Sequence, residues 1–99
     1  MDQALRDKIR LIVTEYVRIF PQEFASFRAG MPMKRAAQRT KYGELAGTSY
    51  IERKTLEMPE TLYTALHKAL TTDEFTEFKT KRGMRWFAKS HPEFAVSTI

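Results

Sequence analysis

Basic side chains carry the clearest chemical signal in this chain, and they fall in two blocks. Residues 31–54 hold six Lys or Arg against two acidic residues, and residues 79–99 hold five against one. The stretch between them, residues 55–78, holds five acidic residues and one lysine. A Lys or Arg laid against a phosphate releases condensed counterions, so two basic blocks folded onto one face would bind a polyanion.

We therefore predict a nucleic-acid-binding protein that contacts the phosphate backbone through a basic face. The residues expected to make these contacts are Lys34, Arg35, Arg39, Lys41, Arg53, Lys54, Lys79, Lys81, Arg82, Arg85, Trp86 and Lys89. Tyr42, Tyr50 and Trp86 lie among them and could stack on unpaired bases, a contact worth about 1 to 3 kcal/mol each. The ordinary structural alternative is a solvated basic face with Trp86 packed as an anchor. DNA or RNA, single-stranded or double-stranded, are all compatible with this pattern.

A second interpretation is a small protein-interaction or inhibitor protein, of the type that phages and mobile elements encode. Its basic face would then bind an acidic partner protein. Four methionines, Met31, Met33, Met58 and Met84, fall near breaks between expected elements and would supply an adaptable contact surface. Blocks of opposite charge also permit self-association by head-to-tail pairing.

Residues suited to catalysis or metal binding are sparse. His67 and His91 are far apart and have no neighbour at metal-ligand spacing. The glycines and hydroxyls of residues 43–49 lack the lysine that a phosphate-cradling loop requires, and the chain has no cysteine. Most carboxylates lie at expected helix starts, where capping and the helix dipole account for their presence. The expectation is a protein that is not an enzyme and that uses no cofactor and no metal.

Length and composition indicate one folded domain. The chain has 99 residues, of which 42% are hydrophobic, enough for a core without disulfides. The N-terminus lacks the apolar core of a signal peptide, and no apolar run approaches the ~20 residues that span a bilayer. Together with the absence of cysteine, this favours a cytoplasmic protein that does not bind membranes.

Helical periodicity is strongest at the N-terminal end of the chain. Residues 2–20 place apolar side chains every three or four positions, with Asp2 as a candidate N-cap, and Pro21 is suited to the first turn of a short second helix. Residues 33–42 are compatible with a helix that has almost no apolar face, and residues 43–48 are expected to form a loop.

The second half of the chain also favours helices. For residues 50–57 a short helix is preferred, with a strand as the alternative. Residues 59–70 predict a clearer helix, and a capping box from Thr71 to Glu74 predicts another that ends at Gly83. These two helices have the layout of a helix-turn-helix, but Asp73, Glu74 and Glu77 argue against a recognition helix there. A last helix is expected over residues 84–90.

The predicted fold class is all-α. We expect a compact single domain of five or six short helices over residues 1–99, with a short irregular or β segment near 50–57 as the alternative to a helix there. The expected core residues are Leu5, Ile9, Ile12, Tyr16, Phe20, Phe24, Phe27, Leu62, Leu66, Leu70, Phe75, Phe78 and Phe87.

Overall fold

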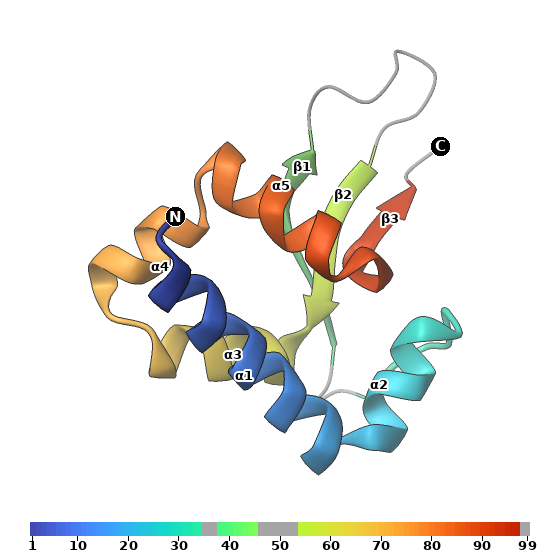
Figure 1. The fold of residues 1–99 in the computed structure, drawn as a ribbon. Coiled ribbons are helices and arrows are strands. Elements are labelled where there is room, and N and C mark those ends of the chain that lie inside the picture. The colour runs from blue at the N-terminus through green and yellow to red at the C-terminus, as the bar shows by residue number, and fades with distance from the viewer. Residues whose placement is uncertain (35–37, 46–53, 98–99) are drawn as a thin grey trace.

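The computed structural model describes residues 1–34, 38–45 and 54–97, and within them the chain combines five α-helices with a three-stranded antiparallel sheet. The helices are α1 (Gln3–Ile19), α2 (Pro21–Arg28), α3 (Glu60–Ala69), α4 (Thr72–Phe78) and α5 (Lys81–Ser90). The strands are β1 (Arg39–Leu45), β2 (Lys54–Pro59) and β3 (Ala95–Ser97), with a short 3-10 turn, η2 (Pro92–Phe94), before β3. In Figure 1, α5 crosses in front of the sheet, and α1 runs below α5.

The sheet shows that the predicted all-α fold class is wrong. Strand β1 occupies residues 39–42, where a helix was expected, and extends into the expected loop; residues 35–37 lie outside the described part of the chain. Strand β2 occupies residues 54–57, so the short helix preferred for 50–57 is wrong there, and the strand alternative is correct; residues 46–53 are not described. The side chains of these segments are compatible with a helix or with a strand. Pairing with neighbouring strands makes the strand the more stable of the two.

Strand β2 is the centre of the sheet, and its neighbours pair with it on both sides. Its antiparallel register with β1 runs from Arg39 opposite Pro59 to Leu45 opposite Lys54. Strand β3 pairs with the first half of β2. Within β2, Leu56 and Met58 are fully buried, so the sheet contributes directly to the core.

A bulge at Tyr42 sends that side chain into an aromatic cluster. The register of β1 against β2 shifts between Lys41 and Gly43, leaving Tyr42 as the extra residue. The Tyr42 ring lies 5.2 Å from the ring of Phe78 and 5.8 Å from that of Tyr63, measured between centroids. The bulge therefore connects the edge of the sheet to helices α3 and α4.

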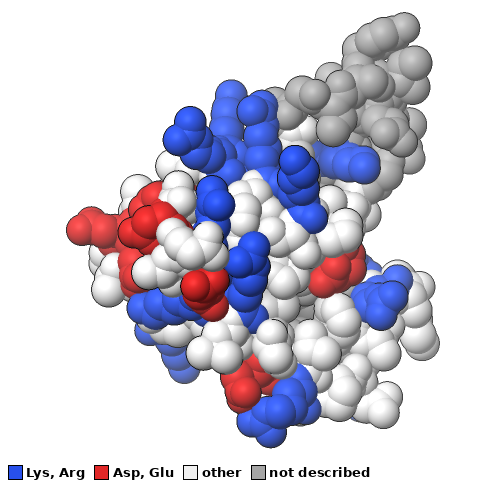
Figure 2. Space-filling view, in the orientation of Figure 1, with Lys and Arg blue, Asp and Glu red and all other residues white. Residues whose placement is uncertain are grey.

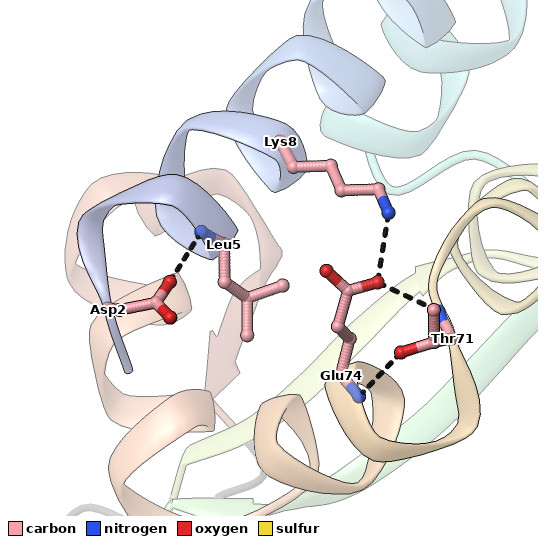
Figure 3. Close-up of polar contacts among 5 residues, drawn as sticks. All are labelled: Asp2, Leu5, Lys8, Thr71 and Glu74. Atoms are coloured by element: carbon pink, nitrogen blue, oxygen red, sulfur yellow. Dashed lines mark hydrogen bonds and ion pairs between the residues drawn. The ribbon is translucent and has the colours of Figure 1, made fainter.

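Three of the predicted helix starts are confirmed. The Asp2 carboxylate accepts a hydrogen bond of 2.8 Å from the Leu5 amide at the start of α1, and Pro21 occupies the first turn of α2. At the start of α4, the Thr71 hydroxyl accepts from the Glu74 amide, and the Glu74 carboxylate accepts from the Thr71 amide. Lys8 of α1 donates to the same carboxylate oxygen at 2.9 Å (Figure 3), so this cap also ties α4 to α1.

The prediction that the helix starting at Thr71 ends at Gly83 is wrong. Helix α4 ends at Phe78, and the Thr80 hydroxyl accepts a hydrogen bond of 3.1 Å from the Gly83 amide as the N-cap of a new helix, α5. A Cβ atom at residue 83 would lie 2.5 Å from the Phe78 carbonyl oxygen. Gly83 therefore permits close packing of α5 on α4 and does not mark a helix end.

Most of the expected core is buried as predicted. Ile12 and Phe24 are only partly buried, and Phe20, with 40% of its surface exposed, was wrongly placed in the core. Val13, Leu56, Met58 and Phe94 are buried but were not expected to be. Ten predicted residues are buried, namely Leu5, Ile9, Tyr16, Phe27, Leu62, Leu66, Leu70, Phe75, Phe78 and Phe87. Among the described helices, none is both long enough and apolar enough to cross a bilayer.

Candidate nucleic-acid interface

Every exposed side chain of α5 is basic. Lys81, Arg82, Arg85 and Lys89, here called the α5 ridge, are the exposed residues of this ten-residue helix. Their spacing of one, three and four residues places them on one face, and the buried Phe87 lies on the other. Two cations in the first turn oppose the helix dipole, so packing against the rest of the protein must hold α5 in place.

Two arginines of α1 extend this basic surface. The guanidinium carbon of Arg6 lies 5.9 Å from the centre of the Trp86 ring, and that of Arg10 lies 5.4 Å from it. Both are within the range of a cation–π contact. Arg6 and Arg10 were not among the predicted residues, because residues 1–30 have nearly balanced charge. Their spacing of four residues on a strongly periodic helix was a usable signal.

Trp86 is therefore a packed anchor and is not an open stacking platform. It is half-buried and has two guanidinium groups near its ring. Tyr42 is also half-buried, and burial raises the pKa of its hydroxyl. Tyr50 lies outside the described residues. Neither described aromatic that was expected to stack on bases presents an exposed ring.

Two of the three acidic residues of α4 are paired with cations of the N-terminal segment. Glu74 binds Lys8 at 2.9 Å, and Glu77 lies 3.3 Å from the N-terminal amine. The hydrogen bonds from Lys8 and from the Thr71 amide lower the pKa of Glu74. Figure 2 shows a group of acidic side chains over the end of the molecule where α4 lies, and basic side chains gathered around α5.

The two basic blocks meet at one place beside α5. Lys54, at the start of β2, and Arg85 of the α5 ridge line the same small cavity of about 230 Å³. Strand β1 packs against α5 here, since a Cβ atom at Gly43 would lie 2.9 Å from the Met84 sulfur. Lys41, two residues before Gly43, is exposed. Lys54 thus extends the basic surface towards the sheet, whereas Lys41 pairs with Glu57 and so lies on the face of the sheet opposite Gly43 and Leu56.

Arg39 was predicted to bind nucleic acid, but the structure gives it a packing role. Its Nη2 donates a 2.7 Å hydrogen bond to the Phe27 carbonyl oxygen, and its guanidinium carbon lies 4.2 Å from the centre of the Phe27 ring. Its Nη1 is 3.8 Å from the Glu57 carboxylate. These contacts tie β1 to α2 and engage both Nη atoms and the face of the guanidinium group.

The remaining predicted residues are not gathered with the α5 ridge by any described contact. Lys79 is the C-cap residue that follows α4, and its ammonium lies 5.2 Å from the centre of the Phe75 ring. Lys34 is exposed beyond the end of α2. Arg35 and Arg53 lie outside the described residues. The structure therefore assembles part of the predicted site, centred on α5, and adds Arg6 and Arg10 to it.

His91 is the half-buried C-cap residue that follows α5. Its ring centre is 5.1 Å from that of Phe87, and burial lowers the pKa of the imidazole. The charge of Arg10 lowers that pKa further, whereas Glu93, 3.6 Å from Nδ1, opposes the shift. In the described part of the chain, no group of three or more His, Asp or Glu side chains is placed to hold a metal ion.

A separate apolar groove follows the other flank of α1. Leu11, Ile19 and Phe20 are exposed by 64%, 55% and 40% and surround a cavity of about 290 Å³ whose far wall is Ala65 and Ala69 of α3. Large apolar side chains that are exposed together commonly mark a contact surface.

Comparison with known proteins gives no guide to function. No protein-family model matches this chain, and neither curated proteins nor solved structures provide a significant match.

Proposed function

We propose that this protein binds nucleic acid through phosphate contacts made by the α5 ridge, with Arg6, Arg10 and Lys54 beside it, and that it does so without catalysis. The observation that supports this proposal most directly is that all four exposed side chains of α5 are cations. Ordinary solvated helix faces mix both signs of charge, whereas a single-sign ridge attracts a polyanion. A cytoplasmic location is part of this proposal, because a chain without cysteine fits a reducing compartment.

The proposal is tested by measuring affinity for labelled duplex DNA, single-stranded DNA and RNA over a range of salt concentrations. If four cations of this basic surface each contact a duplex phosphate, log affinity should fall with log salt at a slope of about −3.6, since each contact contributes ~0.9. No binding to any of these polymers at low salt would remove the proposal.

A matched pair of variants locates the contact. Lys89 lies in the last turn of α5, and Lys68 lies in the last turn of α3, so both have the same relation to a helix dipole. Lys89→Gln should reduce the salt slope by about one phosphate contact. Lys68→Gln, which removes the same charge, should leave it unchanged. Equal effects would show that net charge alone governs binding.

The second candidate function is binding of an acidic protein, and the apolar groove is the observation that favours it. A protein interface combines buried apolar anchors with a polar rim, and the groove offers Leu11 and Ile19 as such anchors. Under this alternative, Leu11→Ser and Ile19→Ser would abolish partner binding. Under the nucleic-acid proposal, the same changes leave the salt slope unaltered. Self-association through either surface would appear as a concentration-dependent mass in sedimentation.

A further inference from the structure

We infer that the partner of the α5 ridge is double-stranded DNA, with α5 lying in the major groove. This inference rests on the proposed function and makes it more specific. It depends on three observations: the observed boundary between α4 and α5, the covered state of the aromatic residues, and the positions of basic residues on both sides of the ridge.

The observed helix boundary removes the sequence-based objection to a recognition helix. With the break at Lys79 and Thr80, the carboxylates of Asp73, Glu74 and Glu77 all belong to α4. Helix α5 itself contains no acidic residue. Two helices joined by this short turn have the layout of a helix-turn-helix, in which the second helix enters the major groove.

The close packing of α4 and α5 makes them one rigid unit. The backbone at Gly83 approaches the carbonyl groups of Glu77 and Phe78 too closely for any larger residue. The Thr80 hydroxyl accepts from the Gly83 amide and donates to the Glu77 carbonyl oxygen at 2.7 Å, which fixes the turn. A rigid support is what a helix needs to enter a groove without losing conformational entropy on binding.

The shape of the site favours a B-form duplex over the other nucleic acids. An α-helix fits the major groove of B-DNA, which is about 12 Å wide, whereas the major groove of A-form RNA is too narrow. Single-stranded polymers are bound by stacking on aromatic rings. On this surface the Trp86 ring lies against Arg6 and Arg10, and the described residues around it offer no open ring in its place.

Basic residues on both sides of the ridge are placed to meet the two groove edges. Arg6 and Arg10 lie beside Trp86 on the α1 side. Lys54 shares a cavity with Arg85 on the side of the sheet. A helix seated in a major groove has one phosphate strand on each side, so these flanking cations match the charge of the DNA.

Arg82 and Arg85, in the first half of α5, are the residues assigned to base edges. In a helix-turn-helix, base contacts come from the N-terminal part of the second helix, and arginine binds guanine through O6 and N7. From Lys81 to Lys89 the ridge covers about 12 Å at 1.5 Å per residue, equivalent to roughly four base pairs. The site therefore reads a short, guanine-containing sequence.

The first experiment measures binding of the 99-residue chain to duplex DNA, duplex RNA and single-stranded DNA of one sequence. It also measures dimethyl sulfate protection of guanine N7, which lies in the major groove. We expect the tightest binding to duplex DNA and protection of N7 within a short site. Tighter binding to RNA or single strands, or duplex binding without N7 protection, would overturn this inference but leave phosphate binding intact. No binding to any of the three would remove the proposed function as well.

The second experiment uses Arg82→Lys and Arg85→Lys, which keep the charge but lose the planar fork of the guanidinium group. The variants should keep the salt slope and the thermal midpoint of the parent. Their preference for guanine-containing over guanine-free duplexes should fall by about tenfold, the size expected for one bidentate contact. An unchanged preference in both variants would contradict the assignment of these arginines to base edges.

Discussion

The backbone of Gly83 lies against the last turn of α4 so closely that a Cβ atom there would sit 2.5 Å from the carbonyl oxygen of Phe78. Because the obstacle is backbone, it cannot rotate aside, and Gly83→Ala must displace α5 or open the end of α4. We expect the variant to lose about 1 to 3 kcal/mol in the free energy of unfolding, the usual cost of overpacking. Urea denaturation followed by circular dichroism measures this loss.

Gly43→Ala is the matched control. Its added Cβ would lie 2.9 Å from the Met84 sulfur, and a thioether side chain can change rotamer to make room. The loss of stability should therefore be clearly smaller than for Gly83→Ala. Equal losses would mean that the α4–α5 contact is no tighter than the contact of α5 with the sheet.

Local signals in the sequence predicted the helix starts, and long-range contacts decided the strands. Asp2, Pro21 and Thr71 act on their own first turns, so their roles were visible from neighbouring residues alone. The segments around Tyr42 and Leu56 become strands because they pair with each other. The paired residues are distant in the sequence, so no pattern of neighbouring residues predicts this pairing. Gly83 was misinterpreted because a glycine required for close packing and a glycine that ends a helix look the same in sequence.

The basic character of the candidate interface was predictable from the sequence, but the basic residues that compose it were not. The cations of α5 are exposed as expected, whereas Arg39 belongs to the packing between β1 and α2. Charge counting cannot separate these two cases, because an arginine that donates to a buried carbonyl contributes the same unit charge as one in solvent. Arg6 was missed for the converse reason, since nearby acidic residues cancel it in the count.

Arg39 provides a test of this distinction. Arg39→Gln removes the hydrogen bond to the Phe27 carbonyl and the contact with the Phe27 ring. We expect it to lower the free energy of unfolding by about 1 to 3 kcal/mol, as for a lost hydrogen bond to a charged group. The salt slope of nucleic-acid binding should not change. A reduced slope with unchanged stability would return Arg39 to the interface.

The capping box of α4 gives a prediction for stability alone. Thr71→Ala removes the hydroxyl that accepts from the Glu74 amide and should cost about 1 kcal/mol of unfolding free energy. Thr76→Ala is its control, because the Thr76 hydroxyl is exposed and bonds only to the Thr72 carbonyl within the same helix. Alanine is favourable at such a position, so thermal denaturation should show no loss there. A similar loss in both variants would contradict a specific capping role.

The lowered pKa of His91 makes the stability of the protein depend on pH. Burial lowers the pKa of its imidazole below the ordinary value of 6.5, with Arg10 acting in the same direction and Glu93 against it. The unfolded chain therefore binds the proton more readily, so stability is complete above pH 6.5 and declines as the pH falls through that value towards the folded pKa. Urea midpoints measured from about pH 7.5 to about pH 5.5 should decrease in the parent protein and decrease less in His91→Gln. This range lies above the main titration of Glu74, whose pKa in the folded protein is lowered from the ordinary value of 4.5. If both proteins lose stability equally over this range, His91 is not the group responsible.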